Sequence, residues 1–310
     1  MPNVSVIMPC FNHGEFLTDS VNSILRQTHS ALELIVVDDC STDNSGDIIR
    51  SLAEGDKRIR VLRHEHNQGL SRSRNDALRI ATGEFIAFCD SDDLWQSEKL
   101  SDQLELLRQH PEYDLVYGDT WIIDGSGSLT GQRFSDLFPP PKVASGSLFQ
   151  ELIARNFINI QSVLMRTECM QSGPAFDERI ELVQDWWYWI KLSRRHGFLY
   201  ADRPMASYRV HSRSTNLLQK RDYCVNQFRV FRCILRDYPD LSAASKADIL
   251  FRMGVDLCDL GKYRAGRPLL WNAAAFMLKD FRSFGTTARA LRRLMMYAGA
   301  SRSEISPAIQ

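Results

Sequence analysis

The chain has 310 residues, which is enough for one large domain or for one domain with an appendage. Hydrophobic residues make up 44% of it and charged residues 25%, a balance that is typical of globular proteins and excludes a disordered chain. The formal net charge is zero, so the composition gives no indication of a nucleic-acid partner, and we expect none.

The cysteines and the hydropathy indicate where the protein works. Seven cysteines are scattered through the chain without a C-x-x-C pair, and several lie inside apolar runs. This pattern favours a reducing environment over a disulfide framework or a zinc site. No signal peptide opens the sequence, and no apolar run approaches the roughly 18 residues of a membrane-spanning helix. We therefore expect a cytoplasmic protein, either free or peripheral at the inner face of the membrane.

Strands and helices alternate through the first half of the chain. Apolar runs predict strands at residues 4–8, 34–37, 60–62 and 85–89, the first of them ended by Pro9. Helical spacing and N-cap residues predict helices at residues 16–27, around residues 48–52 and after Gly69. This order predicts a parallel sheet with helices on its faces, in which ligands bind beyond the carboxyl ends of the strands.

Polar residues gather at three of the predicted strand ends, at positions 9–12, 38–39 and 90–93. The last group, Asp90-Ser91-Asp92-Asp93, places three carboxylates within four residues beside a buried strand. Like charges raise each other's pKa and resist desolvation, so we expect a positively charged partner at this edge.

Asp90 and Asp92 are two residues apart, so an extended backbone points both carboxylates to the same side. Two hard oxygen ligands on one side suit Mg²⁺ or Mn²⁺, which complete their coordination with phosphates and water. The alternative is that the cluster caps a helix at about residues 98–107. We assign that capping role to Asp93 and the metal to its neighbours.

Four blocks of the sequence, taken in order, resemble the family 2 glycosyltransferases. They are VSVIMPCFN at residues 4–12, VVDDCSTD at 36–43, NQGLSRSRN at 67–75 and the D-x-D sequence of Asp90 to Asp92. The resemblance covers roughly residues 3–215. It implies a GT-A fold, which is an α/β architecture with a mainly parallel central sheet, and a nucleotide-sugar donor bound through a divalent metal, Mn²⁺ or Mg²⁺.

The resemblance implies roles for the first two blocks in binding the nucleobase. Pro9 and Phe11 would line the pocket, with Phe11 packing on the base. Asp39 would accept a hydrogen bond from the base, whereas Asp38 and Asp43 are assigned to a turn or an N-cap, which is also the alternative for Asp39. Uracil, and therefore a UDP-sugar, is the default expectation, with thymidine and guanosine donors as alternatives.

The resemblance assigns the phosphates and the metal to the later blocks. Arg74 would approach the diphosphate or hold the nucleotide loop, with Arg72 as the competing candidate and a solvated helix arginine as the alternative for both. Asp90 would contact the ribose or the metal, and Ser91 belongs with the donor-binding residues. Asp92 would coordinate the metal directly.

The second half of the chain offers a candidate catalytic base. Inverting transfer needs a base that takes the proton of the acceptor hydroxyl. Residues 183–189, VQDWWYW, resemble the acceptor segment of the family, in which an E-D pair begins a helix and its Asp is the base. The pair here is Gln184-Asp185, so the base is assigned to Asp185 although the supporting carboxylate has become an amide. The alternative is an ordinary acid in the first turn of a helix, favoured by the helix dipole.

The residues after Asp185 include aromatic side chains and a histidine. Trp186, Trp189 and Ile190 have helical spacing and are expected in the core, while Trp187 lies on another face. Residues 208–216 resemble a loop that closes over the donor in this family, and in some relatives its histidine completes the metal shell. His211 is therefore a candidate metal ligand, with a structural or exposed histidine as the alternative.

Residues 217–310 have a different pattern, which predicts two to four helices with breaks at Pro239, Gly261 and Gly285. We therefore expect a catalytic domain at residues 1–216 and a helical region at 217–310. The chain ends in arginines and lysines interleaved with apolar residues, between Lys279 and Arg302. An amphipathic cationic helix can lie on an anionic membrane, while a solvated face or an oligomer contact are the alternatives.

These features predict an inverting glycosyltransferase that moves one sugar to a hydroxyl of a glycan or lipid-linked acceptor in cell-surface polysaccharide synthesis. A single transfer is expected because no Q-x-x-R-W block follows the acceptor segment. The alternative is a catalytically silent protein on the same fold that binds sugar nucleotides or other partners. A phosphatase of the haloacid dehalogenase type is disfavoured, because its D-x-D would follow the first strand and not the fourth.

Overall fold

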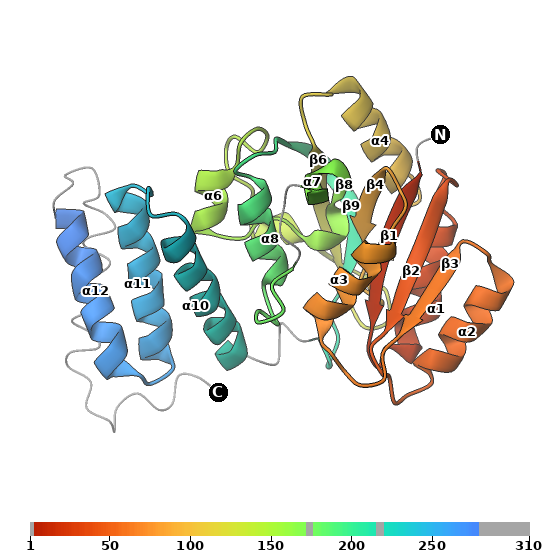
Figure 1. Cartoon of the computed structure of the whole chain (residues 1–310), viewed down its shortest axis with the longest axis horizontal. Coiled ribbons are helices and arrows are strands. Elements are labelled where there is room, and N and C mark those ends of the chain that lie inside the picture. The colour runs from red at the N-terminus through yellow and green to blue at the C-terminus, as the bar shows by residue number, and fades with distance from the viewer. Residues whose placement is uncertain (1–2, 172–175, 215–219, 279–310) are drawn as a thin grey trace. The chain divides into compact units, whose positions relative to one another are not determined.

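The computed structural model describes residues 3–171, 176–214 and 220–278, and the chain divides into two compact units (Figure 1). The first unit comprises residues 1–218 and the second residues 219–310. The basic segment from Lys279 to Arg302 and the predicted break at Gly285 lie outside the described residues.

The first unit contains one sheet with the strand order β3-β2-β1-β4-β8-β6-β9-β5, and β7 pairs with β6 beside this path. The strands in chain order are β1 (Val4–Cys10), β2 (Leu32–Asp38), β3 (Ile59–Arg63), β4 (Phe85–Phe88), β5 (Leu94–Trp95), β6 (Leu115–Ile123), β7 (Leu129–Arg133), β8 (Leu164–Arg166) and β9 (Phe198–Arg209). The helices are α1 (Gly14–Leu25), α2 (Ser45–Gly55), α3 (Leu70–Ile80), α4 (Lys99–Gln109), α5 (Phe134–Leu137), α6 (Phe149–Ala154), η1 (Ile160–Ser162), α7 (Glu168–Gln171) and α8 (Gln184–Leu192).

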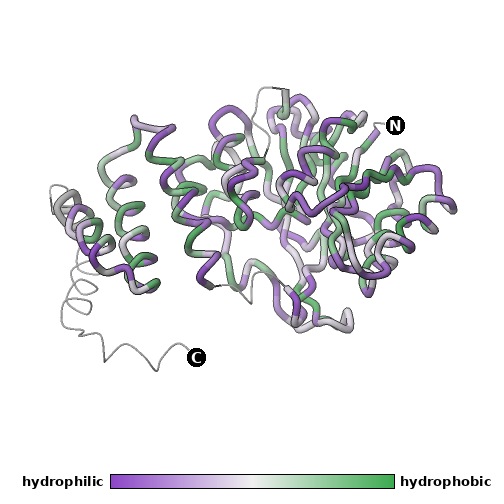
Figure 2. Tube along the Cα trace, turned by 60° about the horizontal axis from the view of Figure 1, so that its bottom comes forward, coloured by the Kyte–Doolittle hydropathy of each residue, from purple (hydrophilic) through white to green (hydrophobic). Residues whose placement is uncertain are grey.

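The four strands predicted in the first half form the parallel part of the sheet. β1 pairs in parallel with β2 and with β4, and β2 pairs in parallel with β3. Every residue of β1 and β2 is buried, which is why these strands are continuous apolar runs and not alternating ones. The trace in Figure 2 is hydrophobic along these strands and hydrophilic in many outer loops. The predicted strand–helix order of this half is therefore confirmed.

One boundary differs from the prediction, because β1 continues through Pro9 to Cys10. Proline cannot donate a hydrogen bond to a neighbouring strand and is normally confined to strand edges or ends. Pro9 is tolerated because the pairing of β1 with β4 stops at Ile7, so Pro9 lies beyond it.

The second half of the sheet is mixed in direction and brings distant segments to the end of β4. β8 is antiparallel to β4, β6 is antiparallel to β8, and β9 is parallel to β6. The short strand β5, which follows the acidic cluster, pairs antiparallel with the end of β9. The register between β6 and β9 shifts at Gly118 and Asp119. As a result, the carboxyl end of β9 lies beside the residues that follow β4.

The second unit is helical, with α10 (Lys220–Asp237), α11 (Ala243–Asp259) and α12 (Tyr263–Leu278). Two of the predicted breaks, at Pro239 and Gly261, fall between these helices. The helices α11 and α12 approach closely at Gly254, where an added Cβ would lie 2.7 Å from Leu270. Within the described ranges, none of the helices has the length and apolar character needed to cross a membrane.

A buried lysine begins helix α4, which follows the acidic cluster in the chain. Lys99, the first residue of α4, donates from Nζ to Oε1 of Gln103 at 2.7 Å and to the carbonyl of Val163 at 3.1 Å. Its Nζ also lies 4.2 Å from the centroid of the Trp95 ring. Burial lowers the pKa of Lys99 to about 7.

The low pKa of Lys99 predicts how stability depends on pH. The folded-state pKa of about 7 lies below the usual value of about 10.5, so unfolding takes up a proton between these pH values. Stability should therefore rise with pH through this window and be lowest below it. Relative to Lys99→Met, we expect the wild type to gain up to about 1.4 kcal/mol per pH unit between about pH 7 and pH 9 in urea denaturation.

The exposed Lys57 provides the matched control, because Lys57→Met should differ from the wild type by an amount that does not depend on pH in this range. A pH-independent difference for Lys99→Met as well would contradict the lowered pKa of the buried amine.

Candidate donor-binding and catalytic site

The side chain of Asn12 joins the loops that follow β1 and β2. Asn12 has a left-handed backbone (φ 57°), and its Oδ1 accepts the backbone N–H groups of Thr42 at 2.7 Å and Asp43 at 3.3 Å. Its own N–H donates to Oγ of Ser41 at 3.1 Å. The neighbouring Phe11 is 42% exposed, so its ring is open to a ligand at the end of β1.

Asp39 is buried, and both of its carboxylate oxygens hold the loop that opens α3. The backbone N–H groups of Gln68 and Gly69 donate to Oδ1 and Oδ2 of Asp39, each at 2.8 Å. Nδ1 of His64 lies 2.7 Å from the same Oδ1. Because a carboxylate oxygen accepts about two hydrogen bonds, Oδ2 retains capacity for one further N–H. Asp38 instead forms a turn, since its Oδ1 accepts the N–H three residues later at 2.9 Å.

Asp90 is held from two sides by buried residues. Nη2 of Arg74 donates to Oδ1 at 2.6 Å, and Nε2 of Gln161 donates to Oδ2 at 2.7 Å. Oε1 of Gln161 also accepts the backbone N–H of Asp90 at 2.8 Å. The amide group of Gln161 therefore bonds both to the backbone and to the carboxylate of Asp90. Arg74 is 1% exposed and Gln161 is buried, whereas Asp90 is partly exposed and presents its carboxylate at the edge of the site.

The two candidate arginines occupy different surroundings. Arg74 is buried beside Asp90, and its guanidinium lies 5.5 Å from the centroid of the Phe176 ring. Arg72 is partly exposed and donates from Nε to Oδ2 of Asp76 at 2.8 Å, with Glu178 at 3.6 Å. The structure therefore brings Arg74, and not Arg72, next to the acidic cluster.

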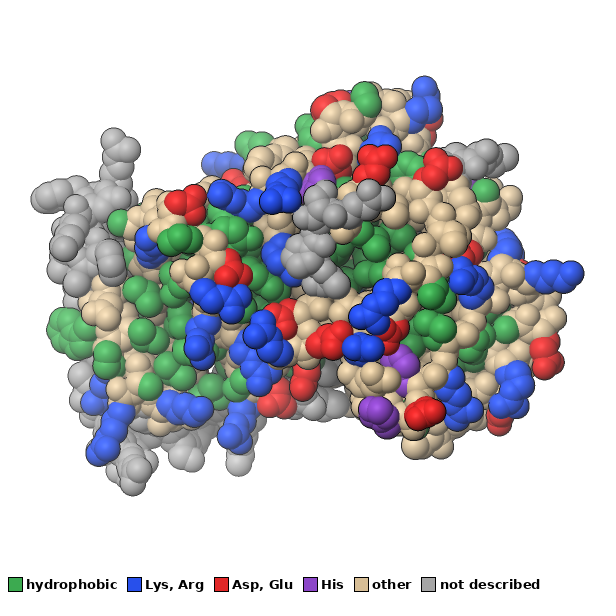
Figure 3. All heavy atoms as spheres, in the orientation of Figure 1, with side chains coloured by type: hydrophobic (Ala, Val, Ile, Leu, Met, Phe, Trp, Pro, Cys, Tyr) green, Lys and Arg blue, Asp and Glu red, His purple; other side chains and the backbone are tan. Residues whose placement is uncertain are grey.

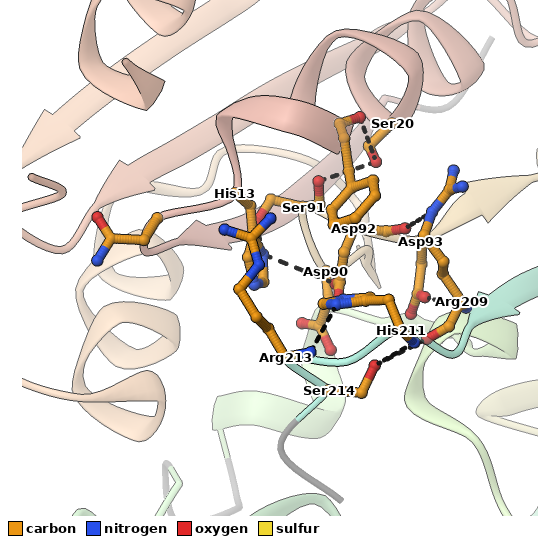
Figure 4. Close-up of polar contacts among 12 residues, drawn as sticks. His13, Ser20, Asp90, Ser91, Asp92, Asp93, Arg209, His211, Arg213 and Ser214 are labelled. Carbon is orange, nitrogen blue, oxygen red and sulfur yellow. Dashed lines mark hydrogen bonds and ion pairs between the residues drawn. The ribbon is translucent and has the colours of Figure 1, made fainter. Parts of the chain in front are cut away.

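Asp92 lies between two imidazole rings, as Figure 4 shows. Nε2 of His211 donates to Oδ2 of Asp92 at 3.1 Å, and Nδ1 of His13 lies 3.8 Å from Oδ1. Nδ1 of His211 accepts the N–H of Arg213 at 3.2 Å, so the ring carries its proton on Nε2. Burial acts to raise the pKa of Asp92, but the hydrogen bond from His211 and the proximity of the two imidazoles outweigh it and lower the pKa overall. Asp92 is therefore ionised.

The residues around Asp92 fit a divalent cation. One ligand atom from each of His13, Asp92 and His211 lies within 4.8 Å of the other two. A carboxylate oxygen and two imidazole nitrogens are donors that bind divalent metals. Ser91, which the sequence assigns to donor binding, is buried and places its Oγ 2.8 Å from Nδ1 of His13.

A second group of potential ligands, Asp114, Cys169 and His196, lies at the opposite edge of the sheet. Asp114 and His196 precede β6 and β9, which run in the same direction as β4, so they lie at the amino ends of the strands. Nδ1 of His196 is 3.1 Å from Asp114, and burial raises the pKa of the Cys169 thiol to about 12.

The prediction that Asp93 caps the following helix is wrong. Helix α4 begins only at Lys99, and Asp93 is completely buried. Its Oδ1 accepts the N–H of Arg209 at 2.8 Å, and Nε of Arg209 donates to the carbonyl of Asp92 at 2.7 Å. Burial, together with the charges of the two neighbouring acids, raises the pKa of Asp93 well above its usual range. The chain turns back into the sheet as β5 at this point, so Asp93 points to the end of β9.

Asp185 lies in the first turn of α8. Its Oδ1 accepts the N–H of Trp186 at 2.7 Å, and Nδ2 of Asn156 donates to Oδ2 at 3.4 Å. Burial raises the pKa of Asp185, and the positive charge of Arg74 partly offsets this rise. The arginine that holds Asp90 therefore also acts on Asp185.

The aromatic residues of α8 belong to the core. Trp186, Trp189 and Ile190 are buried, which confirms the interpretation of their helical spacing. Trp187 is buried as well, with Lys191 Nζ 5.5 Å from its ring centroid, so it does not present an exposed ring for stacking on a sugar.

Figure 3 shows acidic and basic side chains interspersed over the face in view.

Two solved structures share this fold. S. aureus TarS 1–349 in complex with UDP-GlcNAc has a TM-score of 0.68 at 18% identity, covering 96% of this chain and 91% of that one. The mannosyltransferase PcManGT of Pyrobaculum calidifontis, in complex with GDP-Man and Mn²⁺, has a TM-score of 0.60 at 19% identity, covering 95% and 86%. These identities establish the fold alone, and it is the expected GT-A fold.

The family follows from the sequence comparisons. The family model described as Glycosyl transferase family 2 matches residues 5–165. TuaG of Bacillus subtilis (strain 168), a glycosyltransferase named for teichuronic acid biosynthesis, is 33% identical over 214 residues, which is 69% of this chain and 81% of TuaG. The chain belongs to glycosyl transferase family 2, and it is a glycosyltransferase.

Other relatives match a smaller part of their own length. WfgD of Escherichia coli, named UDP-Glc:alpha-D-GlcNAc-diphosphoundecaprenol beta-1,3-glucosyltransferase, is 39% identical over 129 residues, which is 42% of this chain and 49% of WfgD. A glycosyltransferase of Rickettsia felis is 28% identical over 78% of this chain but only 38% of its own length. The chain thus spans about half or less of several curated relatives that it matches.

Sequence reasoning missed two residues of the site, Gln161 and His13. Gln161 lies in a largely apolar stretch far from Asp90 in the chain, and its amide has no spacing rule that links it to an acidic cluster. His13 directly follows Asn12, the last residue of the first block. The position of His13, one residue after a polar group at the end of a predicted strand, is the signal that could have identified it as a site residue.

The double contact of Gln161 with Asp90 predicts a loss of stability together with a weaker response to nucleotides. Gln161→Leu leaves the N–H and Oδ2 of Asp90 without these partners, which we expect to cost about 1–3 kcal/mol in thermal or urea unfolding. Stabilisation by UDP with Mn²⁺ should also become weaker, because Asp90 loses its fixed orientation.

The matched control is Gln103→Leu, since Gln103 is also buried but bonds to Lys99 and to the carbonyl of Ser162. That variant should lose stability and keep the nucleotide response. Equal nucleotide responses in the two variants would show that Gln161 only supports the fold.

Proposed function

We propose that the protein transfers one sugar from a nucleotide-sugar donor to an acceptor hydroxyl, with inversion at the anomeric carbon and with help from a divalent metal. The observation that carries this proposal is the position of Arg74, which bonds to Asp90 of the D-x-D sequence and acts on the charge of Asp185. An acid assigned to the donor and the candidate base are therefore neighbours in space, as a single displacement requires.

The reaction is an in-line displacement. The acceptor oxygen forms the new glycosidic bond while the bond between the anomeric carbon and the diphosphate oxygen breaks, and the acceptor proton passes to the carboxylate of Asp185. Burial raises the pKa of Asp185 and strengthens it as a base, whereas the charge of Arg74 favours its ionised form. Asp92 and His211 would hold Mn²⁺ or Mg²⁺, which when bound supplies positive charge for the leaving diphosphate.

We assign the nucleobase to the loops after β1 and β2. Phe11 offers an exposed ring for packing on the base, Pro9 supports it from β1, and Oδ2 of Asp39 has capacity for one base N–H. Ser91 and Asp90 complete the donor side. UDP is the proposed nucleotide, supported by the UDP-GlcNAc bound to TarS and by the UDP-Glc in the name of WfgD.

Arg74 fits one of its two predicted roles better than the other. Its guanidinium is buried behind Asp90, so we propose that it holds the nucleotide loop and orients Asp90, and that it does not contact the diphosphate directly.

The acceptor is proposed from the relatives. TuaG is named for teichuronic acid biosynthesis, and the name of WfgD contains a sugar on diphosphoundecaprenol, which is a lipid-linked acceptor. We propose that this chain glycosylates a glycan or lipid-linked intermediate of a cell-surface polysaccharide, at the inner face of the membrane. The catalytic domain would comprise residues 1–216, with residues 217–310 as a helical region.

Donor binding is tested by thermal denaturation with UDP, dTDP and GDP, each with and without Mn²⁺. We expect UDP to raise the melting temperature in a metal-dependent way, since a ligand at about 100 times its Kd adds about 2.7 kcal/mol. Asp92→Ala should lose the metal-dependent part, because it removes the proposed metal-binding carboxylate.

The same measurement can contradict the proposal. Metal-dependent UDP binding that persists unchanged in Asp92→Ala would place the metal elsewhere. A response to GDP in place of UDP would correct the base and leave the reaction as proposed.

The role of Asp185 is tested by turnover. Asp185→Asn should lower the rate of UDP release from a UDP-sugar and acceptor by at least about 100-fold, because general base catalysis typically contributes this much. Nucleotide binding should persist, since Asp185 is assigned to the acceptor side.

Asp202→Asn, which changes an exposed acid of β9, is the control and should keep its turnover. If the wild type binds nucleotides but transfers no sugar from a panel of donors, the protein is the silent sugar-nucleotide binder that the Gln184 substitution makes conceivable.

A further inference from the structure

His13 is placed at the acidic cluster by the backbone on both sides of it. Its N–H donates to Oγ of Ser45 at 3.1 Å, and the N–H of Gly14 donates to Oδ2 of Asp43 at 3.0 Å. A Cβ added at Gly14 would lie 1.9 Å from Oδ1 of Asn44, so this exposed side chain would have to move. The residues that follow β2 therefore fix the backbone at His13, and Oγ of Ser91 lies within hydrogen-bond distance of its ring.

The imidazole of His13 faces Asp92 and its neighbour. Nδ1 lies 2.8 Å from Oγ of Ser91 and 3.8 Å from Oδ1 of Asp92, while the ring of His211 is perpendicular to it at a centroid distance of 6.1 Å. The two oxygens of Asp92 thus each face a different histidine. The side chain of His13 is 25% exposed, so solvent and ions have access to it.

We propose that His13 is a metal ligand together with Asp92 and His211, so that two imidazole nitrogens and the carboxylate of Asp92 hold the ion. This inference rests on the proposed metal-dependent function and adds a ligand from the loop after β1. In an octahedral shell with bonds of about 2.1 Å, adjacent ligand atoms lie about 3 Å apart. Nε2 of His211 lies 3.1 Å from Oδ2 of Asp92, which is near this value, whereas Nδ1 of His13 lies farther away, at 3.8 Å from Oδ1. One ligand atom from each of the three residues lies within 4.8 Å of the other two, so a small shift of His13 would complete the set.

This ligand set has a consequence for metal selectivity. Mg²⁺ prefers oxygen ligands and keeps several waters, whereas imidazole nitrogen favours first-row transition ions. A site with two imidazoles should therefore bind Mn²⁺ or Co²⁺ more tightly than Mg²⁺. If His13 took no part, the set would lose one of its two nitrogens and this preference would be smaller.

A metal-dependent response of the protein could also arise in two different ways. The group of Asp114, Cys169 and His196 offers sulfur, nitrogen and oxygen ligands at the opposite edge of the sheet, where an ion could bind instead. His13 could also bind the diphosphate directly, without contact to the metal. Variants of His13, Asp92 and His196 respond differently in these three cases.

The experiment measures binding of Mn²⁺ to the full chain by electron paramagnetic resonance, with and without UDP, and with Mg²⁺ as competitor. We expect His13→Ala to weaken Mn²⁺ binding at least about tenfold, as the loss of even an outer-shell partner typically does. The preference for Mn²⁺ over Mg²⁺ should shrink in the same variant. Spin-echo modulation from directly bound ¹⁴N should fall from two nitrogens in the wild type to one.

His13→Asn serves as the second variant, because it keeps a polar side chain next to Ser91 but removes the imidazole. It should resemble His13→Ala in Mn²⁺ affinity, and both should melt like the wild type without ligands. His196→Ala is the control for the second group of potential ligands and should keep wild-type affinity.

Several outcomes overturn the inference. If Asp92→Ala loses Mn²⁺ and His13→Ala binds it like the wild type, His13 is not a ligand and the metal-dependent function stands. If His13→Ala weakens UDP binding equally with and without Mn²⁺, the histidine serves the diphosphate. If the wild type binds neither Mn²⁺ nor UDP, the proposed function itself fails. Loss of Mn²⁺ in His196→Ala would move the site to the opposite edge.

Discussion

The site depends on one constraint, which is that three carboxylates at the end of a buried strand must each find a separate partner. Asp90 takes a guanidinium and an amide, Asp92 takes two imidazoles, and Asp93 takes a backbone N–H. No single cation among the described residues serves all three acids. Because like charges repel in a dry environment, the charges of Asp92 and Asp90 add to the effect of burial and raise the pKa of Asp93 well above its usual range.

The topology of the sheet supplies these partners. The guanidinium comes from α3 on the parallel side, and the amide comes from η1, which precedes β8. The backbone N–H belongs to the end of β9, which reaches the site because β5 turns back and pairs with it. Residues from the antiparallel half thus complete a site whose motif lies in the parallel half. The second half of the sheet therefore supplies hydrogen bonds to the acids that follow the first half.

The sequence predicts the parallel half well and the antiparallel half poorly, for a physical reason. Apolar runs and helical spacing are local, so the first strands and helices, and the acids at their ends, can be located from periodicity. The partners of those acids are contacts between residues far apart in the chain, and a glutamine such as Gln161 carries no spacing signal. Local pattern assigns Asp93 to a helix cap because it cannot show that the chain turns back into the sheet. Asp185 stands out only through the resemblance to a family.

Arg74 connects the two sides of the site through one charge. It is bonded to Asp90, and the same charge lowers the pKa of Asp185 against the effect of burial. Its Nε and Nη1 have no hydrogen-bond partner within the described part of the chain, so the guanidinium has donors to spare. A bound nucleotide-sugar that draws Asp90 away from Arg74 would leave more of the positive charge of Arg74 to act on Asp185. Binding of a nucleotide-sugar at Asp90 would then be linked to the ionisation of Asp185 through a single guanidinium.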